Sequence, residues 1–212
     1  MLYQYPNAVL MVFCKAPVAG QVKTRLASAL TPEQCVDVHT ELSLKTLDLV
    51  TQSKLCPVQL WCSPSTEHTF FASITTQYTI SLRQQHGNDL GERMHHAFCS
   101  ALKTYRHALI IGCDCPSLMQ SDLVAALTAL TDGNDIVLAP AEDGGYVMIG
   151  LNQAHPEPFD DIPWGKPQVM AKTRERITQY NFQHVEIKKQ WDVDTPADLL
   201  RYYAFINNTA MC

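Results

Sequence analysis

Three short runs of consecutive apolar residues limit what this chain can fold into more than any other feature. They are residues 8–14, 108–112 and 136–139, the last within a strand expected at residues 135–139, and helical patterns lie between them. An apolar run of this length is typical of a β-strand that is covered on both faces. Such strands in alternation with helices predict an α/β domain with a largely parallel sheet.

Weaker patterns add the other elements. Thr31 before Pro32 predicts an N-cap and a helix to about residue 52, and Thr195 before Pro196 predicts one to about residue 206. We also expect Ser121 to cap a helix that ends near residue 130. Further strands are expected at residues 57–62, 78–82, 146–151 and 185–188, and further helices at 66–72, 94–102 and within 165–177.

Size and charge exclude several classes of protein. The 212 residues show no linker or repeat and fit a single domain, residues 1–212. A net charge of −5 gives no support for nucleic-acid binding, and no apolar run approaches the roughly 20 residues that span a bilayer. The N-terminal segment lacks the basic flank of a secretion signal, so we expect a cytoplasmic protein.

The eight cysteines are expected to be reduced thiols. None forms a C-x-x-C pair, and several lie in apolar runs, where cysteine acts as a small hydrophobic residue. Cys113 and Cys115 flank Asp114, but zinc sites typically use cysteine pairs separated by two to four residues, together with partner ligands. This spacing argues against a cysteine-based metal site and fits a reducing compartment.

A basic loop follows the first predicted strand. Residues 13–26 carry Lys15, Lys23 and Arg25, and Gly20 gives the backbone freedom to turn. Ammonium, guanidinium and backbone N–H groups together can bind a polyphosphate. The loop matches neither common phosphate-binding fingerprint, so a solvated basic loop is the alternative interpretation.

Acidic residues follow two other predicted strands. Asp114 comes after residues 108–112, and Glu142 and Asp143 come after residues 135–139. In parallel sheets, ligands gather at the carboxyl ends of the strands. Asp114 is therefore a candidate ligand for Mg²⁺ or Mn²⁺, although it could instead cap the following turn.

Three more segments are candidates for the same site. The pair Gly144 and Gly145 predicts a tight turn after Asp143, which does not exclude close approach of a ligand. Asp192 and Asp194 lie just before the last predicted helix, so one of them could join Asp114, while Asp194 could also cap that helix. Two further residues could frame a sugar or acceptor, or simply pack and pair at the surface, namely Trp164 and Arg93.

Together, these motifs resemble the DUF2064 group of glycosyltransferase-A-like proteins, relatives of the nucleotide-diphospho-sugar transferases. The resemblance spans about residues 9–199. It rests on FCKAPVAGQVKTRL at 13–26, DLGER at 89–93, GCDCPSL at 112–118, EDGGY at 142–146, Trp164, and DVDTP at 192–196.

The resemblance implies a GT-A fold, a Rossmann-like three-layer α/β/α domain with a mainly parallel mixed sheet. It also implies a nucleotide or nucleotide-sugar site and a divalent metal at Asp114. The sequence has Cys113-Asp114-Cys115 where many glycosyltransferases have Asp-x-Asp, so a second carboxylate must come from elsewhere, and we expect Asp194, with Asp192 and Asp143 as alternatives. The candidate nucleotide-binding residues are Lys15, Pro17, Gly20, Lys23, Arg25, Arg93, Gly144 and Gly145.

Two reactions fit this set of residues. In glycosyl transfer, a nucleoside diphosphate leaves and Asp143 positions or deprotonates an acceptor hydroxyl. In nucleotidyl transfer, as in the similar guanylyl- and molybdenum-cofactor nucleotidyltransferases, pyrophosphate leaves an NTP while Lys23 and Arg25 stabilise the transferring phosphoryl group. We expect glycosyl transfer to a small-molecule acceptor, and a non-catalytic nucleotide-sugar-binding protein is a third possibility.

Overall fold

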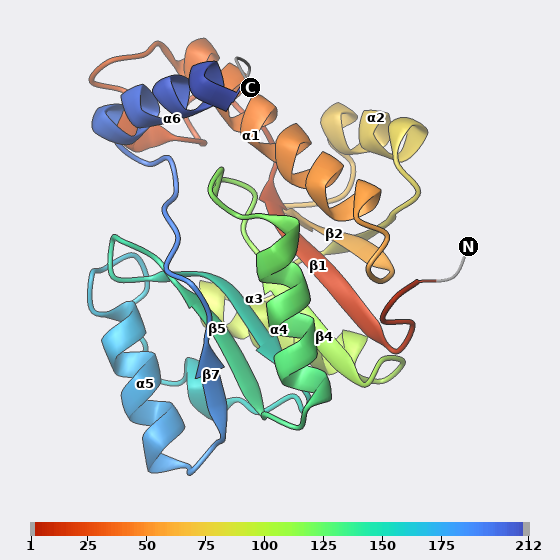
Figure 1. Ribbon diagram of the computed structural model, residues 1–212. Coiled ribbons are helices and arrows are strands. Elements are labelled where there is room, and N and C mark those ends of the chain that lie inside the picture. Colours follow the sequence, from red (N-terminus) through yellow and green to blue (C-terminus); the bar gives the residue numbers. More distant parts are fainter. Residues whose placement is uncertain (1–2, 210–212) are drawn as a thin grey trace.

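The computed structural model describes residues 3–209 of the chain. Within them, one seven-stranded sheet is flanked by helices in the strand order β3-β2-β1-β4-β6-β5-β7 (Figure 1). Residues 1, 2 and 210–212 of the predicted domain, Cys212 among them, lie outside the described residues. No helix in the described part of the chain is long and apolar enough to cross a membrane.

The elements alternate as the sequence predicts. The strands are β1 Ala8–Lys15, β2 Val58–Ser63, β3 Ser81–Gln84, β4 His107–Ile111, β5 Ile136–Pro140, β6 Tyr146–Leu151 and β7 His184–Glu186. The helices are α1 Pro32–Gln52, α2 Thr69–Gln77, α3 Leu90–Ala101, α4 Gln120–Thr131, α5 Val169–Gln179 and α6 Pro196–Thr209. Short 3₁₀ turns lie at Thr24–Leu26 and Glu157–Phe159.

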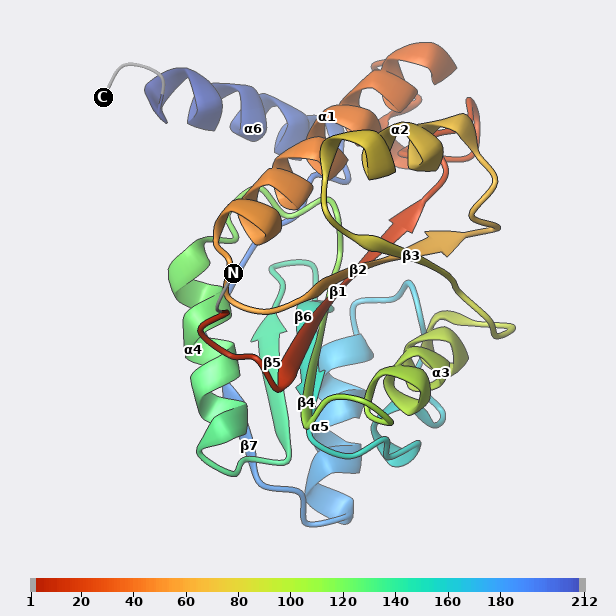
Figure 2. The same cartoon turned by 90° about the vertical axis from the view of Figure 1, so that its right-hand side faces the viewer.

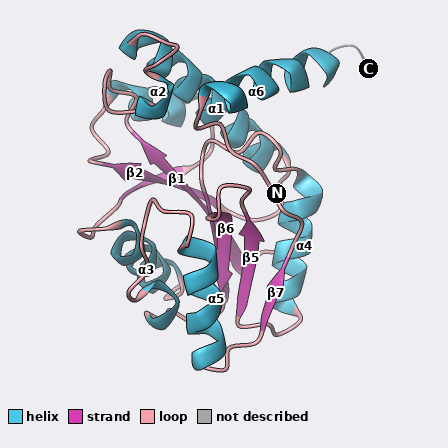
Figure 3. Cartoon of the chain, turned by 90° about the vertical axis from the view of Figure 1, so that its left-hand side faces the viewer, coloured by secondary structure: helices cyan, strands magenta, loops and turns pink. Residues whose placement is uncertain are grey.

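The sheet is mixed and has helices on both faces, which confirms the expected fold class. Every strand pair is parallel except those of β6, which runs antiparallel to β4 and β5. Helices α1, α2 and α4 pack on one face, whereas α3 and α5 pack on the other (Figure 2). Figure 3 shows β5, β6 and β7 side by side between α4 and α5.

Helix starts follow the capping chemistry, which corrects two sequence predictions. Thr31 caps α1 in a capping box with Gln34, as expected. Ser121 does not cap α4, because the N-cap is Met119, two residues earlier, and Met119 N–H donates to the Asp122 carboxylate over 2.9 Å. Helix α2 begins at Thr69 rather than residue 66 because the His68 ring accepts a hydrogen bond from Phe70 N–H.

The last helix, α6, packs outside the sheet against the start of α1 (Figure 1). Tyr202 is fully buried there, and its hydroxyl donates to the Glu41 carboxylate. Arg201 makes two hydrogen bonds of 2.7 and 3.1 Å to Glu142, which follows β5. Glu142 therefore anchors α6 to the β5–β6 turn rather than facing a ligand.

The topology brings the loops that carry the charged candidate residues to one edge of the sheet. Strands β1, β4 and β5 end at this edge, and the antiparallel β6 begins there. The basic loop, the segment after β4, the β5–β6 turn and the segment before α6 therefore meet. The expectation that these strand exits share one site agrees with this arrangement.

Gly150 gives a test of how tightly this sheet is packed. A Cβ at this position would lie 2.7 Å from Val137 Cγ1, 2.8 Å from Leu109 Cδ1 and 2.9 Å from Leu130 Cδ1. We expect Gly150→Ala to lower the free energy of unfolding by about 1–3 kcal/mol, because these apolar neighbours must move. Urea denaturation measures the loss. Ser81→Ala on the exposed edge strand is the control, and an equal effect of both changes would contradict this account.

Candidate active site

The Lys23 ammonium group connects three segments at the edge of the sheet where β1, β4 and β5 end. Lys23 Nζ lies 2.9 Å from Asp114 Oδ2, 3.2 Å from Asp194 Oδ1 and 2.7 Å from the Val193 carbonyl oxygen. The lysine side chain is 5% exposed, whereas the two carboxylates are 33% and 31% exposed. The basic loop is thus tied to the exit of β4 and to the segment before α6.

At Lys23, the attraction between the ammonium group and two carboxylates opposes the effect of burial on their pKa values and the cost of a strained backbone. Burial alone would lower the pKa of Lys23, but Asp114 and Asp194 raise it above its ordinary value. Burial alone would raise the pKa of Asp114, but the Lys23 ammonium holds it below its ordinary value. Lys23 also has a left-handed backbone, with φ of 49°, which costs an L-residue roughly 1–2 kcal/mol. The ion pairs oppose this cost.

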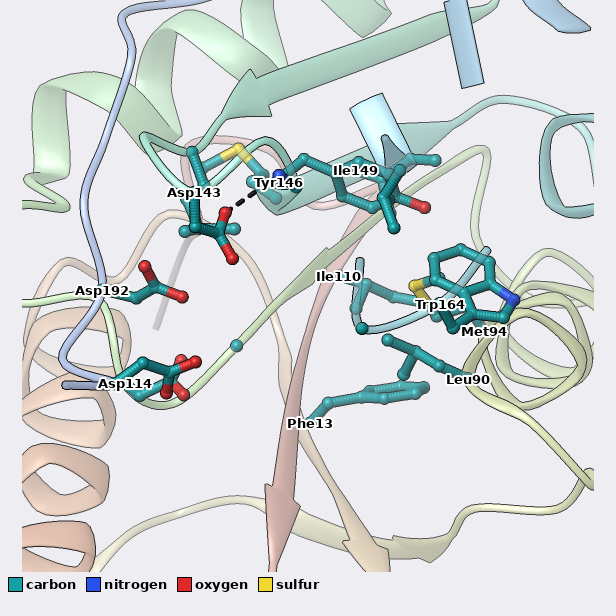
Figure 4. Close-up of a pocket in the computed structure, with 18 of the residues that line it drawn as sticks. Phe13, Leu90, Met94, Ile110, Asp114, Asp143, Tyr146, Ile149, Trp164 and Asp192 are labelled. Atoms are coloured by element: carbon teal, nitrogen blue, oxygen red, sulfur yellow. Dashed lines mark hydrogen bonds between the residues drawn. The ribbon is translucent and has the colours of Figure 1, made fainter. Parts of the chain in front are cut away.

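Asp192 has the opposite environment. Burial, and then the nearby carboxylates of Asp114, Asp194 and Asp143, raise its pKa to about 7. Figure 4 shows Asp114, Asp143 and Asp192 directed toward a common space. The Lys23 ammonium pairs with Asp114 and Asp194. Within the described residues, Asp192 makes no such ion pair.

Two adjoining cavities form one cleft beside these groups. The first, of about 270 Å³, is apolar at one end, with Phe13, Leu90, Met94 and Trp164, and acidic at the other (Figure 4). The second, of about 470 Å³, is lined by the basic loop, including Lys15, Lys23 and Arg25. The cavities share Phe13, Arg25, Leu90, Gly112, Asp114 and Asp194.

The β5–β6 turn brings Asp143 to the cleft. Asp143 Oδ1 accepts a hydrogen bond of 2.9 Å from Gly145 N–H, which orients the carboxylate. Gly145 lines the apolar cavity together with Asp143. Gly144 has a φ of +91°, and a Cβ there would lie 2.1 Å from the Pro167 carbonyl oxygen. The contact that requires glycine at position 144 is therefore with the segment before α5.

Four other predicted residues divide between the cleft and its surroundings. Trp164 lines the apolar cavity, with its ring centroid 6.3 Å from that of Tyr146. Arg93 is not brought to the cleft, because its Nε donates to the Gly87 carbonyl oxygen over 3.0 Å and holds the loop before α3. Pro17 and Gly20 lie on the basic loop but do not line either cavity.

Apart from Trp164, the sequence argument missed the residues at the apolar end of the cleft. Phe13, Met94 and Ile110 occupy positions that read as ordinary core residues of a strand or helix. It also missed the lysine between the two aspartates, because residues 23 and 194 are distant in sequence. Lys23 was expected to face phosphate directly.

Comparison with known families gives this site a context. The profile of the family described as "Uncharacterized protein conserved in bacteria (DUF2064)" matches residues 46–166. The chain belongs to the DUF2064 family. A comparison with curated proteins gave no match.

Solved structures share the DUF2064 fold described above. A protein from Desulfovibrio desulfuricans G20, provisionally named a nucleotide-diphospho-sugar transferase, has a TM-score of 0.82 and 26% identity over 92% of this chain and 85% of its own. The 4-diphosphocytidyl-2C-methyl-D-erythritol synthase from Anaerococcus prevotii DSM 20548 has a TM-score of 0.64 and 10% identity over 95% and 99%. A CMP:2-keto-3-deoxy-manno-octonic acid synthetase in complex with CTP has a TM-score of 0.59 and 11% identity over 96% and 99%. The expected fold and family are both confirmed.

Lys23→Met tests the central ion pairs of this DUF2064 protein. The change leaves Asp114 and Asp194 without their common cation in a partly buried site. We expect the free energy of unfolding at pH 7 to fall by about 2–4 kcal/mol, a range reduced from fully buried pairs because both carboxylates are partly exposed. Urea denaturation measures it. Lys15→Met, which removes an ammonium group that donates to the Gln21 carbonyl, is the matched control. Similar losses in both variants would contradict the proposed importance of Lys23.

Asp192 predicts a pH-dependent stability. A folded-state pKa of about 7, above the ordinary value of 3.8, means that the folded protein binds more protons than the unfolded chain between these values. Stability contributed by this group is therefore lost as the pH rises from about 4 to 7. We expect Asp192→Asn to be more stable than the parent by about 1–3 kcal/mol at pH 8, allowing for its partial exposure, and equally stable near pH 4.

Urea denaturation at both pH values, in a chelator, checks this expectation. Asp37→Asn replaces an exposed acid of α1 and is expected to have an effect below about 0.5 kcal/mol at either pH. A constant difference between the parent and Asp192→Asn from pH 4 to pH 8 would rule out the raised pKa.

Proposed function

We propose that this protein is a transferase that acts on a nucleotide-activated sugar, with glycosyl transfer as its reaction. The observation that carries the proposal is the charge pattern of the cleft. A basic loop with Lys15 and Arg25 faces an acidic wall, and the Asp192 carboxylate of that wall makes no ion pair with any residue that the structure describes. A nucleoside diphosphate bound with a divalent metal supplies negative charge to the loop and positive charge to the wall. The likeness to the provisionally named nucleotide-diphospho-sugar transferase supports this choice.

The donor set fits Mg²⁺ or Mn²⁺. Both ions take carboxylate oxygens, and Asp114, Asp143 and Asp192 are directed toward one space (Figure 4). Asp194 was the second ligand expected from the sequence, and it directs Oδ1 to Lys23 and Oδ2 to Arg25. We therefore assign the metal to Asp114 and Asp192, with Asp194 holding the two basic side chains. When bound, the metal supplies Lewis-acid stabilisation of the leaving diphosphate.

The basic side chains have separable roles in this proposal. Arg25 is 56% exposed and borders both cavities, so its guanidinium group can contact phosphate while Asp194 orients it. Lys15 lines the loop cavity, and its Nζ donates to the Gln21 carbonyl, which keeps the loop closed. Lys23 stabilises negative charge on the departing group through its field and keeps Asp114 ionised.

The acceptor would enter the apolar end of the cleft. Asp143 lies between this end and the acidic wall, and its carboxylate is oriented by Gly145 N–H. A carboxylate there can orient an acceptor hydroxyl and take its proton as the bond to the sugar forms. Phe13, Met94 and Trp164 would exclude water and contact apolar parts of the sugar or acceptor.

Nucleotidyl transfer is the second candidate. The structural likeness to a synthetase in complex with CTP and to a diphosphocytidyl synthase favours it, as does the density of basic residues on the loop. In that reaction the same groups would hold an NTP, Lys23 and Arg25 would stabilise charge on the transferring phosphoryl group, and pyrophosphate would leave.

A ligand panel distinguishes these proposals. We expect one nucleoside diphosphate sugar to raise the thermal unfolding midpoint in the presence of Mn²⁺ or Mg²⁺ only, because a ligand that binds the native state stabilises it by mass action. Asp114→Asn and Asp192→Asn should each abolish the shift, whereas Asp37→Asn should retain it. Release of nucleoside diphosphate in the presence of acceptor alcohols then indicates glycosyl transfer, and release of pyrophosphate from an NTP indicates nucleotidyl transfer.

Two other results would reject the assignment. A shift that persists in both aspartate variants would place the ligand elsewhere. Binding without release of either product, across a broad acceptor panel, would indicate a nucleotide-sugar-binding protein rather than an enzyme.

A further inference from the structure

A second group of potential metal ligands lies behind the basic loop, on the α1 face of the sheet. Cys14 Sγ, Cys113 Sγ and a ring nitrogen of His39 all lie within 4.8 Å of one another. All three residues are buried, with exposed fractions of 1%, 6% and 5%. Cys14 lies near the end of β1, Cys113 lies two residues beyond the end of β4, and His39 comes from α1.

We propose that Cys14, His39 and Cys113 are the ligands of a thiophilic d¹⁰ cation, and that this ion is Zn²⁺. Two thiolates and one imidazole are a donor set that zinc prefers, and the fourth position of such sites is often filled by an oxygen. The proposal concerns an ion distinct from the Mg²⁺ or Mn²⁺ assigned to Asp114 and Asp192, and it does not depend on the transferase assignment.

The distances between the donors are close to those that zinc requires. With Zn–S bonds of about 2.3 Å and Zn–N bonds of about 2.0 Å, tetrahedral geometry separates two donors by about 3.5–3.8 Å. Cys14 Sγ already lies 3.9 Å from His39 Nε2, and no pair of the three exceeds 4.8 Å. Side-chain adjustments of under about 1 Å therefore bring the donors to bonding positions around a common centre.

An oxygen atom is available as the fourth ligand. His39 Nε2 lies 2.8 Å from the Lys15 carbonyl oxygen, and its N–H donates to that oxygen. In the metal-bound state the ring carries its proton on Nδ1 instead, so Nε2 is free to coordinate and the Lys15 carbonyl loses this donor. That oxygen, or a water molecule from the cleft, can complete the coordination.

Charge and access both permit an ion at this depth. Zn²⁺ with two thiolates and a neutral imidazole has no net charge, which limits the cost of its burial. Each protonated thiol loses one proton to solvent as its sulfur binds. His39 and Cys113 line the cavity of the basic loop, so an ion can reach the donors from the cleft.

An ion at this location would be bound by residues directly next to those of the candidate active site. Cys14 precedes Lys15, and Cys113 precedes Asp114, the proposed ligand of the catalytic metal. A zinc ion would fix the ends of β1 and β4 relative to α1. It would thereby set the positions of the Lys15 carbonyl and the Asp114 backbone.

Cobalt substitution tests the proposal. The reduced protein, freed of metal with a chelator, is titrated with Co²⁺ in excess Mg²⁺, which competes for the carboxylate site. We expect tetrahedral d–d absorption and a sulfur-to-cobalt charge-transfer band that saturate at about one equivalent and disappear on addition of Zn²⁺. Cys14→Ser, Cys113→Ser and His39→Gln should each weaken binding at least about tenfold.

Matched controls separate this site from other thiols and from the acidic wall. Cys56→Ser replaces another buried thiol of the same core, and Cys99→Ser replaces a partly exposed one. Both variants, and Asp192→Asn, should retain the cobalt spectrum. Absence of the charge-transfer band in the parent, or its persistence in both Cys14→Ser and Cys113→Ser, would overturn the proposal.

A second measurement needs no variant and therefore survives any folding defect. The parent protein is alkylated in mild denaturant with and without Zn²⁺, and the labelled cysteines are identified by mass spectrometry. We expect Zn²⁺ to slow labelling of Cys14 and Cys113 far more than that of Cys56. Equal protection of all three thiols, or a Cys14–Cys113 disulfide that forms while the reduced protein binds no cobalt, would reject the site.

Discussion

The buried ammonium group of Lys23 is the contact on which the arrangement of the cleft depends. It holds Asp114, from the end of β4, and Asp194, from the segment before α6, at 2.9 and 3.2 Å. Without this cation, two partly buried carboxylates would share one region of the cleft with no positive charge between them. The left-handed backbone at Lys23 is accepted because the same residue satisfies both. The ion pairs thus fix the basic loop, the sheet and the last helix relative to one another.

This internal cation also divides the acidic residues by role. Asp194 spends its charge on Lys23 and Arg25, so it belongs to the framework of the site. Asp192, two residues earlier, lies near the carboxylates of Asp114, Asp194 and Asp143, and within residues 3–209 it makes no ion pair. The contacts of Asp194 with Lys23 and Arg25 therefore distinguish a structural aspartate from one that is suited to bind a ligand.

Much of the fold could be predicted from the sequence because its central strands consist largely of consecutive apolar residues. Residues 8–14 and 135–139 became β1 and β5 almost unchanged, and the Thr31–Pro32 cap started α1. Edge elements were less accurate, as the shift of α2 and β3 shows. An edge strand such as β3 has weak hydrophobic alternation, and the start of a short helix such as α2 depends on local contacts such as the His68 cap. The strand exits singled out in the sequence do meet at one cleft.

The details of the site could not be predicted because they depend on pairs that are distant in sequence. Lys23 and Asp194 meet only once α6 has packed on α1, and no local pattern signals their contact. The same reason hid the thiols. Spacing along the chain compared Cys113 with Cys115, whereas the fold places the sulfur of Cys113 within 4.8 Å of that of Cys14, about one hundred residues earlier. Parallel strands are joined by long crossover connections. Residues that are far apart in the sequence therefore come together at the carboxyl ends of the strands, where ligands bind.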